Sequence, residues 1–265
     1  MKKIIVSILV LFLFVITASA QEGWLFQNSQ STNYLWSVQF TDDLTGWVVG
    51  EDNTILKTTD AGNSWINQQV TANISLKDLH FIDNSYGWTV GTEETFPNDT
   101  AVILRTTNEG VNWTKNLIGD SLSLESVYFV SQNTGWIVGT FGLEWPNIFG
   151  IILKTTDGGS TWVKNYNSDT TSEFFDIYFF FFFTGWVVGR DGKILKTTDS
   201  GANWTDHSIS AHALKSIFFI DQNIGWSVGG YGGLGLLAKT TNGGIDWSIQ
   251  TLDNTAWLQS VYFVN

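Results

Sequence analysis

One sequence unit recurs five times along the 265-residue chain. Its clearest mark is a Gly-Trp pair, and successive pairs stand 41, 48, 50 and 40 residues apart. The five pairs are Gly46-Trp47, Gly87-Trp88, Gly135-Trp136, Gly185-Trp186 and Gly225-Trp226. An alternating segment such as LWSVQF (35–40) precedes each pair, and a motif such as TTDGGSTW (155–162) follows it. Three motifs in a fixed order at this spacing indicate a repeat architecture.

Each unit is long enough for four short strands. In the first unit we expect strands at 36–41, 47–50, 54–59 and 64–70, joined by short turns. The first strand alternates, so one side should carry Trp36, Val38 and Phe40 and the other Ser37 and Gln39. Four strands per unit are typical of a propeller blade, because a sandwich does not repeat its sequence and a solenoid repeat is shorter.

The predicted fold is an all-β propeller of four-stranded antiparallel blades. We place five complete blades at about 35–70, 76–118, 124–167, 174–210 and 214–252. Partial strands are expected at 24–28 and 258–264, as the fourth and the first strand of one more blade. Because the two strands between them are missing, we expect the chain to be a truncated form of a ring of about six or seven blades.

The TTDxGxxW motif has a structural explanation. An Asp or Asn side chain accepts hydrogen bonds from nearby backbone N–H groups and closes the turn, and the Gly adopts positive φ. The Trp begins the fourth strand and covers the hairpin. We therefore assign structural roles, rather than catalysis or metal binding, to the Asp-box residues Asp60, Asn108, Asp157, Asp199, Asn242, Trp65, Trp113, Trp162, Trp204 and Trp247.

The first 20 residues have the features of a signal peptide. Two lysines precede an apolar stretch at 4–16, and ASA at 18–20 matches a signal peptidase site. The stretch is too short to cross a bilayer comfortably, and no later segment is apolar enough to do so. We therefore predict export to the periplasm or the extracellular space and a mature domain at 21–265. An uncleaved N-terminal anchor is the alternative.

Composition excludes several classes of function. The formal net charge is −12, from 13 basic and 25 acidic residues, which argues against binding to nucleic acid. The chain has no cysteine and therefore no disulfide and no Cys-linked lipid. The three histidines, His80, His207 and His212, lack the spacing of metal ligands. Since there is also no phosphate loop or nucleophile motif, we predict no metal and no cofactor.

The consensus GWxVGxxGxILKTTDGGxTW resembles the photosystem II assembly and stability factor family, a branch of the BNR/Asp-box propellers. The resemblance covers about residues 24–265 and is clearest at 185–204, GWVVGRDGKILKTTDSGANW. It implies a non-enzymatic protein that lies on the lumenal side of the membrane and assists assembly of the photosystem II reaction centre. Similar repeats occur in secreted bacterial proteins, so a photosystem II assembly factor is one alternative beside a more general binding protein.

The connections between the second and third strands are the predicted binding surface. Three of them are long, at 92–101, 140–150 and 230–235, and should lie at the end of the propeller opposite the Asp boxes. Variable loops on a rigid scaffold are the usual place for binding. Our candidates for contact with a protein or carbohydrate partner are Glu93, Glu94, Phe96, Phe141, Glu144, Trp145, Phe149 and Tyr231. Alternatively, Trp145 and Phe149 fold back over the blade edge.

The fourth unit contains a run of five phenylalanines at 179–183. Its last three residues stand where another unit has the turn sequence SQN, at 131–133. An exposed run of Phe would suit a partner or membrane contact. We favour the other explanation, a homopolymer error in the underlying gene.

Two classes of function remain open. A sialidase needs an arginine cluster, which Arg105 and Arg190 alone cannot form. A two-carboxylate glycosidase needs acids about 5–10 Å apart, and Glu94 and Glu144 could supply them, although nothing in the sequence singles them out. We therefore predict a non-enzymatic scaffold or binding protein, with an Asp-box glycoside hydrolase as the alternative.

Overall fold

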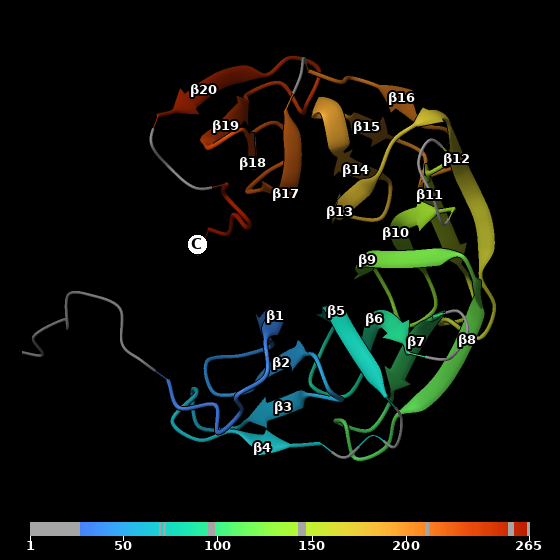
Figure 1. Ribbon diagram of the computed structural model, residues 1–265, viewed down its shortest axis with the longest axis vertical. Helices are drawn as coiled ribbons and strands as arrows, with labels where there is room; N and C mark the ends of the chain where they lie inside the picture. The colour runs from blue at the N-terminus through green and yellow to red at the C-terminus, as the bar shows by residue number, and fades with distance from the viewer. Residues whose placement is uncertain are drawn as a thin grey trace, which may run out of the picture.

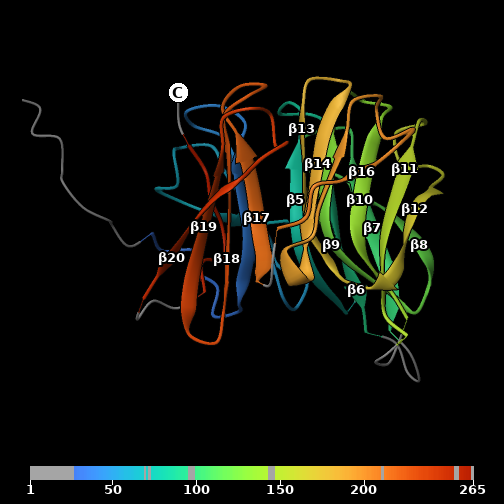
Figure 2. The same ribbon diagram turned by 90° about the horizontal axis from the view of Figure 1, so that it is seen from above.

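Five four-stranded antiparallel sheets surround a central axis (Figure 1). The computed structural model describes residues 27–68, 70, 73–94, 99–142, 147–209, 212–253 and 257–263. In every sheet the strands lie in chain order from the axis outward, so that each sheet is one blade. Seen from the side, the innermost strands run from one end of the ring to the other (Figure 2). The predicted all-β propeller with five complete blades is therefore confirmed.

The strands fall into four classes by their place in the blade. The innermost strands are β1 (Leu35–Phe40), β5 (Ile74–Phe81), β9 (Leu122–Phe129), β13 (Phe174–Phe180) and β17 (Ala213–Phe219). The second strands are β2 (Gly46–Gly50), β6 (Gly87–Glu93), β10 (Gly135–Phe141), β14 (Thr184–Gly189) and β18 (Gly225–Tyr231). The third strands are β3 (Ile55–Thr58), β7 (Thr100–Thr106), β11 (Phe149–Thr155), β15 (Ile194–Thr197) and β19 (Leu234–Thr240). The outer strands are β4 (Ile66–Asn67), β8 (Thr114–Asp120), β12 (Val163–Thr171), β16 (Thr205–Asp206) and β20 (Ser248–Leu252), and a short 3-10 helix, η1 (Arg190–Gly192), follows β14.

The indoles of the Gly-Trp pairs hold neighbouring blades together. Trp136 of β10 stacks on Phe179 of β13, with ring centroids 3.8 Å apart and an interplanar angle of 17°. The Asp-box residue Trp204 meets the same phenyl ring edge-on, at 6.2 Å and 81°. Equivalent stacks join Trp47 to Phe81, Trp88 to Phe129 and Trp186 to Phe219. Each pair of adjacent blades is thus packed through a buried indole–phenyl stack.

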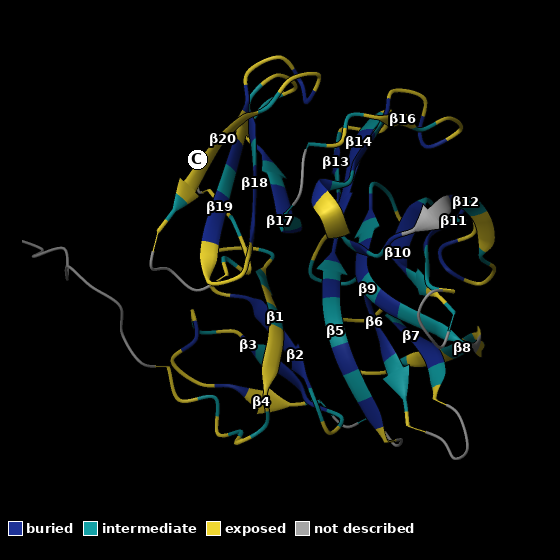
Figure 3. Ribbon diagram, turned by 45° about the horizontal axis from the view of Figure 1, so that its top comes forward, coloured by how far each residue is buried: buried dark blue, intermediate teal, exposed yellow. Residues whose placement is uncertain are grey.

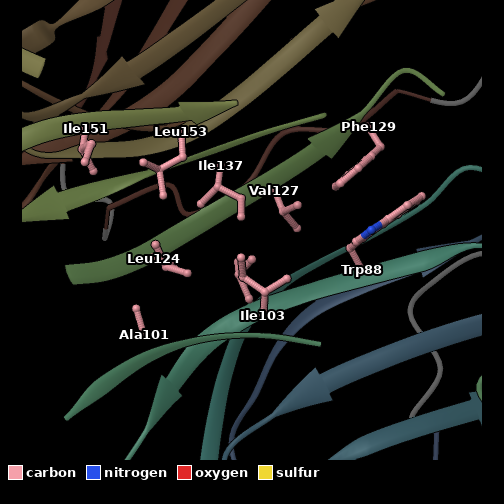
Figure 4. Close-up of a cluster of buried hydrophobic side chains, with 10 residues drawn as sticks. Trp88, Ala101, Ile103, Leu124, Val127, Phe129, Ile137, Ile151 and Leu153 are labelled. Carbon is pink, nitrogen blue, oxygen red and sulfur yellow. The ribbon is translucent and has the colours of Figure 1, made fainter. Parts of the chain in front are cut away.

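Burial is concentrated in the second strands, whereas outer strands such as β4 and β20 are exposed (Figure 3). The close-up of one core cluster shows Trp88 and Phe129 face to face beside aliphatic side chains from neighbouring strands (Figure 4). The core is therefore divided into clusters that lie between blades, rather than forming one central core. This follows from the repeat, because each blade buries its faces against its two neighbours.

In each GWxVG segment, both glycines lie where another group of the protein comes too close to leave room for a side chain. In the third blade, a Cβ on Gly135 would lie 2.5 Å from the ring of Phe129. A Cβ on Gly139 would lie 1.9 Å from the backbone carbonyl oxygen of Ser123. Neither place has room for a side chain, so the two glycines mark where a phenyl ring and the backbone of β9 cross β10.

The Asp boxes close the turns between the third and fourth strands. Asp157 accepts hydrogen bonds from the hydroxyl and the backbone N–H of Thr161, at 2.6 and 2.9 Å, and from the hydroxyl of Thr155 at 2.8 Å. These bonds, led by the one from the Thr161 side chain, lower the pKa of Asp157 to about 2. The N–H of Gly158 donates to the carbonyl oxygen of Asn133 at 2.9 Å. The Asp boxes therefore lie at the same end of the ring as the turns between the first and second strands.

The ring is open between β1 and residues 257–263 (Figure 1). We expected a strand over 258–263. This segment lies beside β17 but does not pair into a sheet. The ring centroid of Phe263 nevertheless lies 4.3 Å from that of Trp226. At the other blade interfaces, a phenyl ring of the next blade occupies this place beside the indole. Phe40 of β1 has no such stack among the described residues and is 45% exposed. Most of the other expected partial strand, 24–28, lies outside the described residues.

The last three residues of the phenylalanine run, 181–183, form the turn after β13. In the other four blades this turn begins with a side chain that accepts two backbone N–H bonds, namely that of Asp42, Asp83, Ser131 or Asp221. Phe181 stands at that position with a φ of 60° and is 76% exposed. The turn therefore lacks a side-chain acceptor, and its first residue is in the left-handed region, which is unfavourable for a bulky side chain.

We expect Phe181→Asp to raise the free energy of unfolding by about 1 kcal/mol. An aspartate at this position can accept hydrogen bonds from the N–H groups of Phe183 and Thr184, as the side chain of Asp221 does in the next blade. Urea denaturation of the variant and the parent protein measures the difference. Phe182→Asp is the matched control, because it adds the same charge without the acceptor geometry. An equal gain in the control would show that the lower hydrophobicity, and not the turn, is responsible.

Candidate functional site

A β-bulge interrupts each innermost strand near its start. In β5, Leu76 pairs with Gly91 and Asp78 pairs with Val90, so that Lys77 is an extra residue. The extra residues of the other four strands are Trp36, Glu125, Phe175 and Lys215. A bulge turns a side chain out of the strand's alternation. We refer to these five residues as the bulge layer.

The bulge in β1 lies at the start of the predicted alternation. Trp36 is its extra residue, and it lines both the central channel and a pocket that it shares with Val38 and Phe40. The expected separation of Trp36 from Ser37 stays a prediction. The alternation resumes after the bulge.

The innermost strands line a central channel of about 530 Å³. The bulge layer is at one end of this channel, near the connections between second and third strands. In the first blade, for example, Glu51 of that connection donates its N–H to the carbonyl oxygen of Tyr34, two residues before Trp36. Next along the axis is a Ser/Asp layer: Ser37, Asp78, Ser126, Asp176, Ser216 and Ser260. Toward the Asp-box end is an aromatic layer: Gln39, His80, Tyr128, Tyr178, Phe218 and Tyr262.

Two carboxyl groups of the Ser/Asp layer share one serine. The hydroxyl oxygen of Ser126 lies 2.9 Å from Oδ2 of Asp78 and 3.0 Å from Oδ1 of Asp176. A hydroxyl donates a single hydrogen, so both contacts are hydrogen bonds only when one carboxyl group is protonated and donates to Ser126. Asp78 also accepts from the N–H of Val127, at 2.9 Å, and Asp176 from that of Ile217, at 2.8 Å. The layer therefore joins neighbouring blades, and it holds a proton when both contacts are hydrogen bonds.

Desolvation shifts the pKa values of several groups in the channel. Loss of water around Asp176, together with the nearby charge of Asp78, raises the pKa of Asp176 to about 7. Desolvation also raises the pKa of Asp78. In the aromatic layer, desolvation lowers the pKa of His80 to about 4, so its imidazole is neutral at pH 7. The described residues include no group of three or more His, Asp or Glu placed to hold a metal ion.

The aromatic layer also joins blades. Its rings follow one another in the order His80, Tyr128, Tyr178, Phe218 and Tyr262, with centroid distances of 4.3, 5.5, 5.3 and 5.0 Å. The hydroxyl of Tyr178 donates to the carbonyl oxygen of Phe219 in the next blade at 2.9 Å. The amide of Gln39 makes two bonds with the backbone of Phe81. Both layers below the bulge layer thus serve to hold the ring together.

The connections predicted to bind a partner are shorter than expected. In the β6–β7 hairpin the strands extend as far as Glu93 and Thr100. In β10–β11 they extend to Phe141 and Phe149, and in β18–β19 to Tyr231 and Leu234. Four of the candidate residues are therefore in strands rather than in loops: Glu93, Phe141, Phe149 and Tyr231. Strand pairing extends into these segments because the backbone ladder continues past the core without a break in register.

The described candidates lie in three separate blades. Glu93 forms an ion pair of 2.8 Å with Lys115, and Glu94 accepts a hydrogen bond of 3.0 Å from Asn73. Phe141 and Phe149 are partners across the β10–β11 hairpin. Tyr231 meets the ring of His212 edge-on at 6.0 Å. None of these five candidates lines the channel. Phe96, Glu144 and Trp145 lie outside the described residues.

A sequence profile of one protein family matches most of the chain. The family is described as "Photosynthesis system II assembly factor YCF48", and the match covers residues 16–115 and 164–257. The chain belongs to this family. No curated protein sequence matches it.

Several solved structures resemble this YCF48-family chain. One described as "YCF48 bound to D1 peptide" is 19% identical, with 82% of each chain covered and a TM-score of 0.45. An ancestral GH74 enzyme is 15% identical over 86% of this chain and 32% of its own, with a TM-score of 0.64. A GH74 enzyme from Niastella koreensis is 17% identical over 82% and 38%, with a TM-score of 0.62. The likeness to the GH74 enzymes shows the fold alone.

The bulge layer of this YCF48-family protein was missed by sequence reasoning. The available signal was a pair of adjacent polar residues inside an otherwise alternating strand: KD at 77–78, ES at 125–126 and KS at 215–216. Two polar neighbours cannot both point away from the core of a regular strand, since alternate residues face opposite sides. In three of the five units the sequence therefore contained a sign of the bulge. In the other two, an aromatic residue takes the bulged position.

The described residues include no helix long and apolar enough to cross a membrane.

Proposed function

We propose that this protein is an exported, non-enzymatic propeller that binds a segment of a partner protein at the bulge-layer end of the ring. The proposal rests on one difference among the three channel layers, which is whether their side chains form hydrogen bonds between neighbouring blades. The Ser/Asp and aromatic layers hydrogen-bond neighbouring blades. Among the described residues, no side chain of the bulge layer does so, and these side chains line the open channel.

The chemistry of this end suits a polypeptide. It combines aromatic surface from Trp36 and Phe175 with the charges of Lys77, Glu125 and Lys215. Aromatic and charged groups together can contact both the apolar and the polar parts of a peptide. Membership of a family described as an assembly factor supports a protein as the partner. The YCF48 structure with a D1 peptide concerns that protein, and for this chain we propose only the class of partner.

Export is part of the proposal. The apolar stretch at 4–16 and the ASA sequence at 18–20 support a signal peptide cleaved after Ala20. The absence of cysteine fits a domain that gains its stability from packing rather than from disulfides.

We expect a photo-crosslinking amino acid at the bulge-layer end, but not at the Asp-box end, to capture a discrete partner in cells. The test positions are Phe141 and Tyr231, which are 44% and 65% exposed. The matched control is Val111, an Asp-box position that is 75% exposed. Mass spectrometry of the adducts measures the result, and the N-terminus of the propeller chain in them should be Gln21. Equal capture at Val111 would contradict the proposed surface, and turnover of a polysaccharide by the purified protein would contradict a non-enzymatic role.

A further inference from the structure

The bulge layer contains two lysines whose ammonium groups lie against aromatic rings. Lys215 Nζ is 3.3 Å from the centroid of the Phe175 ring. Lys77 Nζ is 4.5 Å from the centroid of the Trp36 ring. Each lysine comes from one blade and each ring from the preceding one, so the two pairs belong to different blade interfaces at the same end of the channel. Cation–π contacts of this kind orient an ammonium group without neutralising it.

Among the described residues, neither ammonium group forms an ion pair. The ion pairs among the described residues involve Lys57, Lys115, Arg190 and Lys193 instead. Lys215 is partly buried, and desolvation lowers its pKa, with the charge of Lys77 acting in the same direction. Both lysines line the same channel. They place two positive charges there, in a chain whose net charge is −12.

The nearby acidic groups leave this site incompletely neutralised. The charges of Glu125 and Glu173 oppose the shift at Lys215, but Glu125 accepts a hydrogen bond from Ser123, and Glu173 pairs with Arg190. In the layer below, Asp78 and Asp176 hold one proton between them when both contacts to the shared serine are hydrogen bonds. An ammonium group in this setting gains most from an incoming acceptor that carries its own charge.

We propose that Lys77 and Lys215 bind a carboxylate of an extended peptide, with Trp36 and Phe175 contacting the apolar groups next to it. This inference rests on the proposed function, because it names the chemistry by which the bulge-layer end recognises its partner. The carboxylate lies at the channel entrance and accepts hydrogen bonds from the two ammonium groups. The channel of about 530 Å³ admits the last few residues of a chain, but not a folded domain.

Isothermal titration calorimetry with an N-acetylated Ala-Leu hexapeptide tests the proposal on the full-length protein. The peptide is used with a free C-terminal carboxylate and as the C-terminal amide. We expect binding of the free acid with a Kd below about 1 mM and at least tenfold weaker binding of the amide. Affinity should fall as salt is added, because the interaction is between charges. No binding of the free acid, or equal binding of both forms, would overturn the proposal.

Substitutions identify the residues. Lys77→Met and Lys215→Met should each weaken binding of the free acid about tenfold, since each removes one charge-assisted hydrogen bond. Lys215→Arg should retain binding, and Lys239→Met, at an exposed lysine outside the channel, should leave the affinity unchanged. Thermal unfolding checks that each variant is folded. Wild-type affinity in both methionine variants would disprove the assignment.

A competition experiment separates a peptide from a free small carboxylate. Succinate at the concentration of the hexapeptide should not displace it, because succinate lacks the apolar groups that contact the rings. Full displacement would show that the site takes small carboxylates and would overturn the peptide part of the proposal. Capture of a partner at Phe141 and Tyr231 is measured independently, so failure of the carboxylate site and failure of the proposed function are distinguishable.

Discussion

Replacing Trp136 with alanine is expected to lower the free energy of unfolding by about 3–5 kcal/mol. Its indole is fully buried between two blades, stacked on Phe179 and close to Gly201 of the Asp box. The indole nitrogen has no hydrogen-bond partner in the described structure, so the loss comes from packing and from the cavity that remains. Urea denaturation followed by circular dichroism measures the change.

The matched control is Trp257→Ala, which removes an indole that is 41% exposed. We expect it to cost clearly less than Trp136→Ala, because a large part of this indole is already exposed to water. A second variant, Trp136→Phe, keeps an aromatic ring in the stack and should fall between the other two. If Trp136→Ala cost no more than the control, the indole stacks would not be what holds the blades together.

The blade interfaces were largely predictable from sequence, and the reason is repetition. A Gly-Trp pair that recurs at the same place in five units points to one packing solution used five times. The structure supplies the physical cause at Gly135 and Gly139, where neither position has room for a Cβ. The Asp boxes were predictable for the same reason, because turn chemistry is local and Asp157 is held by residues within four positions of it.

The candidate site was predicted less well, because it depends on relations between units. Lys77 and Lys215 are far apart in sequence, and they line one channel only because the blades form a ring. Their inward direction depends on bulges, and the sequence carried only an indirect sign of these, the adjacent polar residues of three units. The sequence instead directed attention to long connections, and there strand pairing moved Phe141 and Tyr231 out of the loops.

The variants Asp176→Asn and His80→Gln are expected to change the pH dependence of stability in opposite directions. The pKa of Asp176 is raised from 3.8 to about 7, so this group takes up a proton on folding, and its contribution to stability is lost as pH rises from about 4 to 7. The pKa of His80 is lowered from 6.5 to about 4, so this group releases a proton on folding, and its contribution is lost as pH falls from about 6.5 to 4.

In the parent protein the contributions of Asp176 and of Asp78, whose pKa is also raised, oppose that of His80 between pH 4 and 6.5. Asp176→Asn removes a contribution that is lost as pH rises, so the slope of stability against pH should become more positive than in the parent, by at most about 1.4 kcal/mol per unit. His80→Gln removes a contribution that is lost as pH falls, so the slope should become more negative than in the parent, with a similar limit. Gln is the suitable replacement because Gln39 occupies the equivalent place in the first blade.

Urea denaturation at pH 4.5, 5.5 and 6.5 measures the slopes, and Asp43→Asn, at an exposed aspartate outside the channel, should keep the parent slope. The slope is the informative quantity, because an amide at position 176 also alters hydrogen bonds with backbone N–H groups and lowers stability at every pH. Parallel slopes in all four proteins would contradict a proton held between Asp78 and Asp176. Slopes that change in opposite directions from the parent would show that the layers joining the blades also set the pH range in which the ring is stable.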